Sequence, residues 1–281
     1  MIIKIGLAEI PPLTFAGLRY TIAFVCLLPL AFTNKNREQI KQLGKNDLAK
    51  LFIYGLLFIA ITQGAMFAGL VYLPAVTVSL WLNFTPLVVA VLAIFLIKEI
   101  PSILQWTGVI LFITGIMTYF FPIALSENQE IGLIIMTVGV FANSASSVLG
   151  RSINRETKIN PVVVTIVSMG IGSVILLISG IVIQGFPLIS TQNIIYLLWL
   201  AVINTALAFT IWNYTLRTLS AMESSIINGT MLIQIAVLAW IFLGEAITLQ
   251  EGIGMLIAAL GALLVQLKIR KISSLKKTSV T

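Results

Sequence analysis

Eleven polar or indole side chains interrupt long apolar stretches of this chain, and they are its best candidates for binding a ligand. They are Gln63, Ser79, Trp81, Asn83, Asn143, Ser147, Asn204, Trp212, Asn213, Asn228 and Gln234. Amides and hydroxyls form hydrogen bonds with neutral or zwitterionic organic molecules, and an indole ring can stack on a ligand ring. The same side chains can instead join neighbouring helices or fill the space between them. The pattern therefore indicates a binding cavity, with interhelical contact as the alternative for each single residue.

Three further residues stand out, because a charge or a proline is unusual inside an apolar stretch. Arg19 and Glu223 carry charges, and each is a candidate for coupling binding to a proton or an ion. Alternatively, Arg19 reaches the outer interface or pairs with Glu9 or with a neighbouring backbone group, and Glu223 stabilises the first turn of its helix through the helix dipole. Pro86 removes one backbone hydrogen bond and is a hinge candidate.

The residue types needed for most enzymatic chemistry are missing. The chain contains no histidine and a single cysteine, Cys26, so it lacks the parts for a His- or Cys-based metal site, a nucleophilic triad or an internal disulfide. No pair of acids is positioned for acid–base catalysis, and no phosphate-binding glycine loop is present. The sequence therefore predicts a protein that is not an enzyme and that has no metal site and no cofactor.

The elements that must position these residues are membrane helices. Of the 281 residues, 59% are hydrophobic and only 10% are charged, with a mean hydropathy of +1.07. About a quarter of the residues are charged in a soluble domain. One helical crossing needs about 20 apolar residues, and only helices satisfy every backbone group in such a segment. The sequence predicts an all-α integral membrane protein with about nine membrane helices, over residues 12–32, 50–72, 75–97, 103–121, 131–150, 161–184, 193–215, 219–243 and 252–268.

The chain is an internal duplication. Residues 73–115 align without a gap on residues 219–261, and ten of the 43 positions are identical. Each copy carries one acid at a helix end, Glu99 in the first, where we expect it to fix a loop. Each copy also carries two glycines seven residues apart, Gly108 and Gly115 in the first. We expect these glycines to hold each terminal helix against its own half.

A second alignment concerns the start of the first copy. Residues 10–21 correspond to residues 159–170 at an offset of about 149, which places the counterpart of the 131–150 helix at about −18 to 1. We therefore expect the first helix of the first half to be largely missing. A genuine nine-helix bundle is the alternative.

Basic residues gather in alternate loops, which predicts an orientation. Fifteen of the seventeen Lys and Arg residues fall in loops around 35–50, 98, 151–158 and 217 and in the tail 268–277. The intervening loops contain none. By the positive-inside rule, the basic loops and the C terminus are cytoplasmic, in a multi-pass protein of the cell membrane. The second half is then inverted relative to the first, and the net charge of +7 requires no nucleic-acid partner.

On these residues the chain resembles the EamA-type transporters of the drug/metabolite transporter superfamily. The match is carried by PPLTFAGLRY at 11–20, FTPLVVAVLAIFLIKE at 84–99, the glycines at 108 and 115, and VLAWIFLGEAITLQEGIGMLIAALG at 237–261. The resemblance implies an inverted five-plus-five helix repeat. Residues 1–121 would be the first EamA repeat, lacking most of its first helix, residues 131–268 the second, and residues 269–281 a basic cytoplasmic tail.

One departure concerns the proline that the family commonly has in both its fourth and ninth helices. Pro86 supplies the first, but Leu232 stands at the aligned position of the second copy. We therefore expect the 219–243 helix to be straighter than the 75–97 helix.

The resemblance also implies a function. Such a protein would be a secondary-active membrane transporter, an exporter of small organic metabolites such as amino acids or amphipathic compounds, working by alternating access. Its partners would be a small-molecule substrate and the lipid bilayer, with proton coupling as one option and the oligomeric state unknown. The alternative from another class is a non-transporting membrane scaffold or a lipid-interacting subunit.

Overall fold

The computed structural model describes residues 9–122, 129–231, 233–234, 237, 241 and 247–267. This part of the chain is built from helices and contains no strand. Eight helices within it are long and apolar enough to cross a membrane, which confirms an all-α integral membrane protein. Each of the eight falls on a predicted stretch. The remaining predicted stretch, 219–243, lies partly outside the described residues.

The first half contains four of the eight spans, two of them made of several pieces. Helices α4, η1 and α5 run on as one span, Lys45–Tyr72, in which η1 is a π-helical segment. Helices α6 and α7 are the two pieces of another span. The helices are α2 (Pro12–Ala31), α3 (Asn34–Lys41), α4 (Lys45–Gly55), η1 (Leu56–Ile61), α5 (Thr62–Tyr72), α6 (Ala75–Leu82), α7 (Thr85–Ile97) and α8 (Ile103–Phe120).

The second half repeats this order. Helices α11, η2 and α12 again form one span, Thr191–Thr215, and η2 is again π-helical. The helices are α9 (Glu130–Arg155), α10 (Pro161–Gln184), α11 (Thr191–Ala201), η2 (Val202–Leu207), α12 (Ala208–Thr215), α13 (Ala221–Gly229) and α15 (Leu249–Gln266). Helix α2 corresponds to α10, so α9 has no counterpart among the described residues of the first half.

Short polar signals between the apolar runs set several helix starts. Ser102 begins α8 and Ser220 begins α13, each through reciprocal hydrogen bonds with the third residue of its helix. Thr248 and Glu251 form the same arrangement at the start of α15. Proline occupies the first turn of α2 and of α10, where a missing N–H leaves no intrahelical bond unmade.

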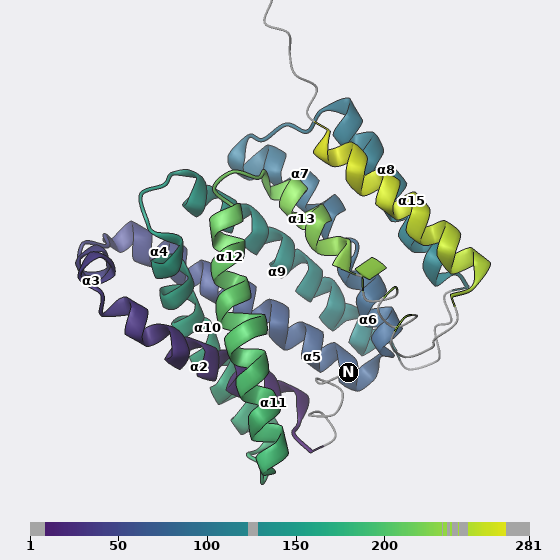
Figure 1. Ribbon diagram of the computed structural model, residues 1–281. Helices are drawn as coiled ribbons and strands as arrows, with labels where there is room; N and C mark the ends of the chain where they lie inside the picture. Colours follow the sequence, from purple (N-terminus) through teal and green to yellow (C-terminus); the bar gives the residue numbers. More distant parts are fainter. Residues whose placement is uncertain are drawn as a thin grey trace, which may run out of the picture.

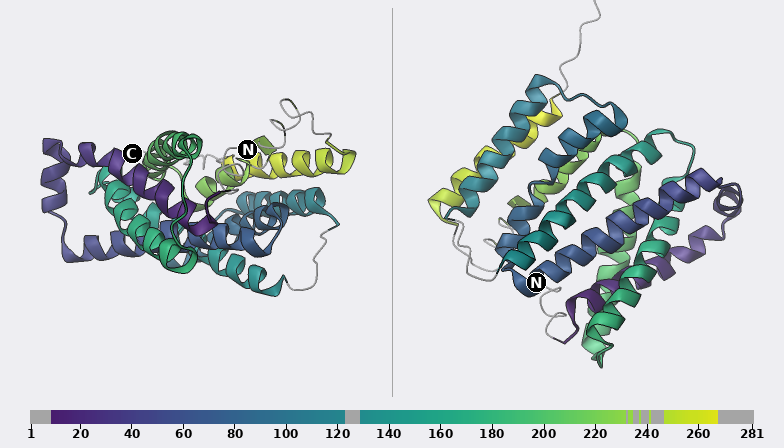
Figure 2. Two further views of the ribbon diagram at one scale, coloured as in Figure 1. Left: turned by 90° about the horizontal axis from the view of Figure 1, so that it is seen from below. Right: turned by 180° about the vertical axis from the view of Figure 1, so that it is seen from behind.

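The two halves interlock. Helix α2 of the first half lies along α10 of the second, and α8 lies along α15 (Figure 1). Helices α5, α9, α7 and α13 lie between these two outer pairs, and the view from behind shows the same order (Figure 2). One buried apolar cluster surrounds α2 and α10, and another fills the space between α7, α8, α13 and α15. Each of the two outer helix pairs, α2 with α10 and α8 with α15, thus joins a helix of the first half to a helix of the second.

The recurring glycines lie at one of these contacts. A Cβ atom added at Gly115 would lie 2.3 Å from the backbone nitrogen of Ala258, and one at Gly261 would lie 2.4 Å from a backbone nitrogen of α8. Gly108 and Gly254 face the backbone of the opposite helix in the same way. The expectation that these glycines hold each terminal helix against its own half is therefore wrong. They let α8 and α15 approach each other across the repeat boundary, because inversion places equivalent surfaces face to face.

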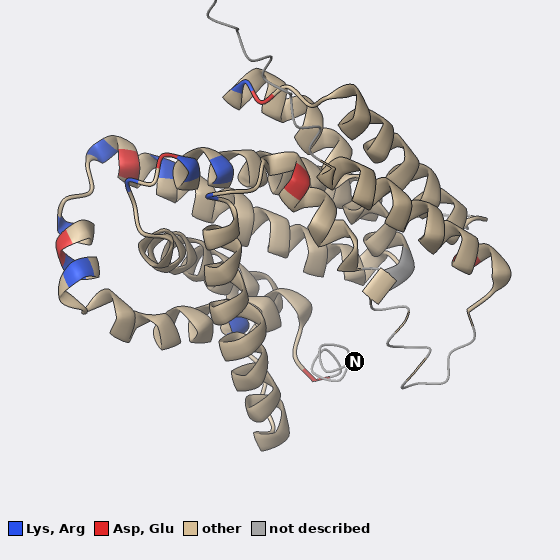
Figure 3. Cartoon of the chain, turned by 45° about the horizontal axis from the view of Figure 1, so that its top comes forward, with Lys and Arg blue, Asp and Glu red and all other residues tan. Residues whose placement is uncertain are grey.

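The described Lys and Arg residues gather along one end of the bundle, with the exception of Arg19 inside α2 (Figure 3). At that end Lys50 and Lys158 both pair with Glu156, at 3.6 and 3.4 Å. Burial raises the pKa of the Glu156 carboxyl, but the two lysine charges outweigh it and hold this pKa below its ordinary value. The one-sided charge agrees with the alternation of basic loops in the sequence.

Candidate functional site

The span made of α6 and α7 is broken. Helix α6 ends at Leu82 and α7 begins at Thr85, so Asn83 and Phe84 form the break. Asn83 is buried, and its side-chain amide donates a hydrogen bond of 2.8 Å to the carbonyl of Ser79. Pro86 lies in the first turn of α7 and has no N–H to continue the ladder of α6. The hinge candidate therefore lies directly after an interruption of the helix.

The span that begins with α13 is broken at the equivalent position, although no proline stands there. Helix α13 ends at Gly229, Thr230 forms a turn, and helical residues resume at Met231. The hydroxyl of Thr230 donates a hydrogen bond of 2.7 Å to the carbonyl of Ile227, in competition with the backbone ladder. The missing proline therefore does not leave this span continuous, because the helix is interrupted at Gly229 and Thr230 instead.

The two breaks have the same geometry and face each other. The carbonyl of Phe84 accepts from the N–H groups three and four residues later, at 3.1 and 3.3 Å, and the carbonyl of Thr230 does the same at 3.0 and 3.3 Å. A Cβ atom added at Gly229 would lie 3.5 Å from Oδ1 of Asn83 and 2.7 Å from the ring of Phe112. The breaks of opposite halves therefore meet inside the bundle.

Helix α9 brings further predicted residues to the first break. The indole N–H of Trp81 donates to Oγ1 of Thr137 (3.2 Å), and the amide of Asn143 donates to Oγ1 of Thr85 (3.2 Å). The hydroxyl of Ser147 donates to the carbonyl of Asn143, at 2.9 Å. Trp81 and Asn143 thus connect the broken span with α9, and Ser147 lies one turn after Asn143 in α9.

The spans Lys45–Tyr72 and Thr191–Thr215, which are equivalent in the two halves, share a second irregularity. The π segments η1 and η2 begin at Leu56 and Val202, which are equivalent positions at the same offset of 146 that relates the two breaks. A π turn disrupts the regular ladder and recurs at functional sites in helical proteins. The sequence contains no proline or glycine inside either segment that would have indicated it.

Arg19 of α2 lies against η2. Its Nε donates to Oγ1 of Thr205 at 2.7 Å and its Nη2 donates to the carbonyl of Asn204 at 3.3 Å, and the residue is only 5% exposed. Glu9 instead accepts a hydrogen bond of 2.6 Å from Asn193. The alternative in which Arg19 pairs with Glu9 is therefore wrong.

Asn213 belongs to a separate, closed cluster. Its Oδ1 accepts from the hydroxyl of Tyr54 (3.2 Å) and from the amide of Asn154 (2.8 Å), and its own amide donates to Oγ1 of Thr165 (3.1 Å). All four residues are buried. They join the Lys45–Tyr72 span, α9, α10 and α12. Such a buried network stabilises helix contacts, which is the alternative stated for each polar residue.

The remaining predicted residues lie on more open surfaces: Gln63, Ser79 and Trp212 are half-buried, and Asn204, Asn228 and Gln234 are exposed. A difference between the two halves accounts for the exposure of residues near the second break. Thr85 lies under α9 and is buried, whereas its counterpart Met231 is 55% exposed. No described helix of the first half stands where α9 stands in the second.

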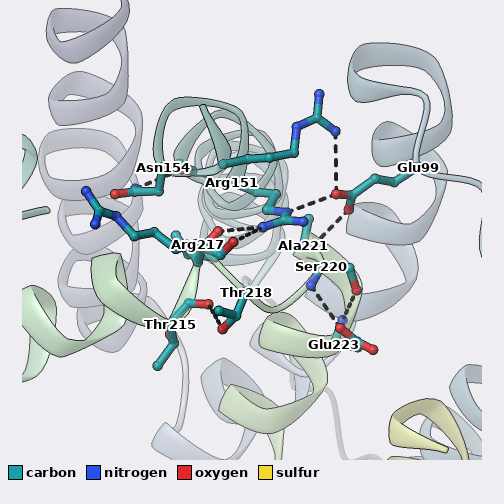
Figure 4. Close-up of polar contacts among 12 residues, drawn as sticks. Glu99, Arg151, Asn154, Thr215, Arg217, Thr218, Ser220, Ala221 and Glu223 are labelled. Atoms are coloured by element: carbon teal, nitrogen blue, oxygen red, sulfur yellow. Dashed lines mark hydrogen bonds and ion pairs between the residues drawn. The ribbon is translucent and has the colours of Figure 1, made fainter. Parts of the chain in front are cut away.

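A charged cluster that sequence reasoning did not assemble lies at the basic end (Figure 4). Oε1 of Glu99 pairs with Nε of Arg151 at 2.9 Å and with Nη1 of Arg155 at 3.7 Å, while Oε2 accepts from the N–H of Ala221 at 3.2 Å. Arg151 also donates to two backbone carbonyls of the loop before α13, at 2.8 and 2.9 Å. The expected role of Glu99 in fixing a loop is confirmed. Its recurrence in both copies was the signal for this cluster.

A cavity of about 610 Å³ adjoins this cluster, between the basic ends of α7, α8, α13 and α15. Its lining includes Glu99, Arg151, Gln105 and Glu223. Glu223 is 4% exposed, and its carboxylate accepts from the N–H of Ser220 at 2.8 Å. The acid thus caps its own helix in the first turn, which bears out the alternative based on the helix dipole.

Inverted, interlocked halves with broken helices at their interface are the architecture of secondary transporters. The fold and this interface therefore define a multi-pass membrane transporter. Residues 1–121 and 130–267 match the model of the EamA-like transporter family, and the chain belongs to that family. The resemblance seen in the sequence is confirmed. A transporter of this family works in a lipid bilayer on small molecules, and its class is non-enzymatic.

Similar proteins support the assignment. The chain is 29% identical to the uncharacterized transporter YvbV of Bacillus subtilis (strain 168), over 94% of this chain and 86% of that protein. It is 22% identical to the uncharacterized transporter YoaV of the same organism, over 92% of this chain and 88% of that protein. One crystal structure has the same fold, with a TM-score of 0.79 and 14% identity over 96% of this chain and 92% of the other.

Proposed function

We propose that this chain is a secondary-active transporter that exports small organic metabolites, such as amino acids or amphipathic compounds, by alternating access. The observation that carries the proposal is the pair of breaks at Asn83–Phe84 and Gly229–Thr230, which belong to opposite halves and face each other. Broken helices at a repeat interface present free backbone groups to a substrate. A movement of one half against the other changes the access to such a site without dismantling either half.

The groups around the breaks favour a neutral or zwitterionic substrate over an ion. The predicted cavity residues lie in the Lys45–Tyr72 span, in α6–α7, in α9, in the Thr191–Thr215 span and in the span starting with α13, and none of them is charged. The two charged candidates, Arg19 and Glu223, stand apart from them as coupling candidates. Asn83, Asn143 and Trp81 offer amide and indole groups beside one break. Pro86 acts as a hinge in one half, and Gly229 takes that place in the other.

In this proposal, the energy for transport comes from the concentration gradient of the substrate or from a proton gradient across the membrane. Glu223 is the coupling candidate in this proposal, because its carboxylate lines the cavity and holds the N–H of Ser220. By the positive-inside rule, the cavity and the C terminus face the cytoplasm of a cell whose plasma membrane holds the protein.

Counterflow in proteoliposomes tests the proposal. Vesicles preloaded with one unlabelled metabolite at high concentration should accumulate the labelled compound transiently, and amino acids and amphipathic amines are the panel to test. A scaffold or lipid-interacting subunit produces no exchange. Absence of exchange across the panel in vesicles with folded protein would therefore favour that alternative.

Cysteine labelling tests the site itself. In a Cys26→Ser background, Asn83→Cys and Asn204→Cys should change their rate of maleimide labelling when an exchanged substrate is added. Val182→Cys is the matched control, because Val182 is 77% exposed on α10 and belongs to neither break. Rates that change equally at all three positions, or at none, would show that the proposed site is wrong.

A further inference from the structure

The charge of Arg19 is paired with no described carboxylate, and its guanidinium carbon lies 5.5 Å from the ring centroid of Tyr20. Arg19 is the eighth residue of α2, so it lies about 10 Å along the helix at about 1.5 Å per residue. Its two hydrogen-bond partners, Oγ1 of Thr205 and the carbonyl of Asn204, are neutral. Among the described residues no carboxylate lies within ion-pair distance of it, and Glu9 is bonded to Asn193. A cation at this depth without an anion is costly and is by default a functional group.

The bonds that Arg19 makes orient the rest of its guanidinium. Nε is held by Thr205, whose own hydroxyl hydrogen goes to the carbonyl of Leu200 (2.9 Å), and Nη2 is held by Asn204. A guanidinium has five N–H donors, and these two bonds use only part of them. The edge formed by Nη1 and the second hydrogen of Nη2 makes no hydrogen bond to a described residue. Asn204, whose backbone carbonyl holds Nη2, is an exposed residue.

The other half packs the equivalent helices together without a cation. Ser168 of α10 stands at the position equivalent to Arg19, at the offset of 149, and it packs on Gly55 directly before η1. A Cβ atom added at Gly55 would lie 2.3 Å from the carbonyl oxygen of Ser168. A π segment of this fold therefore packs closely on its neighbour without an arginine. Stability of η2 alone does not account for Arg19.

We propose that Arg19 binds the carboxylate of the transported substrate beside η2. The proposal rests on the transport function proposed above and narrows its substrate class to organic carboxylates, including zwitterionic amino acids. The free edge of the guanidinium fits a carboxylate through two parallel hydrogen bonds. Thr205 and Asn204 hold that edge in place before the substrate arrives, and the exposed amide of Asn204 supplies a further polar group.

Counterflow with matched compounds tests this site in the full-length chain. L-Leucine is compared with its methyl ester and with 3-methylbutylamine, and L-tryptophan with its methyl ester and with tryptamine. Each ester or amine keeps the side chain and lacks the carboxylate. We expect wild-type protein to exchange the acids at least about tenfold more effectively, the factor that charge-assisted hydrogen bonds provide.

Variants locate the effect. Arg19→Gln should raise the concentration of acid needed for half-maximal exchange by about tenfold or more, and Arg19→Lys should retain part of the preference. Ser168→Ala, at the equivalent position of the other half, is the matched control. It should change neither the half-maximal concentration of the acid nor the preference for acids over esters and amines. If Arg19→Gln does not fold, as judged by gel filtration, the wild-type comparison of acids with esters still decides the question.

Four outcomes would overturn the site. Equal exchange of acids, esters and amines by the wild type, or unchanged acid exchange by folded Arg19→Gln, would leave transport standing and make Arg19 a structural contact. Acid exchange that phosphatidylglycerol inhibits in the wild type but not in Arg19→Gln would assign the charge to a lipid headgroup. If the wild type exchanges nothing in the wider metabolite panel, the transport proposal itself fails, and this site fails with it.

Discussion

Glu99 shows how one carboxylate can set the arrangement of several helices. It lies just after α7, and it binds two arginines of α9 and the first N–H of α13. The side chains of Glu99 and Arg151 are 21% and 12% exposed, so water screens the pair only in part. Lys50 and Glu156 form a pair of the same type whose side chains are 43% and 38% exposed. The two pairs therefore allow a matched comparison.

We expect Glu99→Gln to lower the free energy of unfolding by about 2 kcal/mol, because Arg151 loses its anion while it stays partly buried. Lys50→Gln should lower it by less than about 1 kcal/mol, since exposed ion pairs contribute little. Thermal unfolding of the purified variants in detergent measures both. Equal shifts in the two variants would contradict the importance given to the Glu99 cluster.

At the scale of residues, the sequence identified the polar side chains but not their partners. Asn83, Trp81 and Asn143 meet at one break, whereas Asn213 lies in a closed cluster with Tyr54. Helical spacing tells which residues share a face of one helix. It does not tell which neighbouring helix that face contacts. The neighbouring helix decides whether a side-chain amide has hydrogen-bond partners within the protein.

At the scale of elements, the contact of α8 with α15 depends on glycine at defined positions. A Cβ atom added at Gly115 of α8 would come closer to a backbone nitrogen of α15 than real Cβ atoms do. A Cβ atom added at Gly252 of α15 meets nothing within 4 Å. The two positions differ in their surroundings and not in the type of residue.

Gly115→Ala should therefore destabilise the protein by about 1–3 kcal/mol, because one of the two backbones must move away. Gly252→Ala should cause no loss, since alanine has the better helix propensity and has room there. The midpoint of thermal unfolding of each variant is the measurement. A loss of stability at Gly252 as large as that at Gly115 would mean that the close approach of the helices is not the cause.

The boundaries of the helices could be predicted well, but their interruptions could not. Apolar runs predicted the ends of spans such as α8 and α10 within a few residues. The break after α13 was missed because proline was taken as the requirement for a break. Gly229 and Thr230 produce the same hydrogen-bond pattern that accompanies Pro86. Packing in the bundle, and not one residue type, decides where a ladder is interrupted.

At the scale of the whole molecule, the charge distribution predicts which end of the bundle faces the cytoplasm. In a Cys26→Ser background, Lys158→Cys lies at the basic end and Gln192→Cys at the start of α11, and both positions are exposed. A membrane-impermeant maleimide added to intact cells should label the second and not the first, because basic loops stay inside. Permeabilised cells, in which both must react, are the control. Labelling of Lys158→Cys in intact cells would reverse the orientation.

The class of the fold followed from the sequence, but the way the halves meet did not. Hydropathy, loop charges and the internal alignment predict inverted halves made of membrane helices. Two halves of such a pattern can lie beside each other or interlock. The choice depends on contacts such as α2 with α10 and α8 with α15, which lie far apart in the chain.

The two π segments have a consequence for the history of the chain. A π turn takes up one residue more than the α-helix around it, and η1 and η2 hold that surplus at the same register of the two halves. One insertion in a half-length ancestor explains both, whereas two independent insertions would have had to reach the same place. A surplus residue that was present before the duplication would produce this shared register. At Arg19, which has serine as its counterpart, the two copies differ.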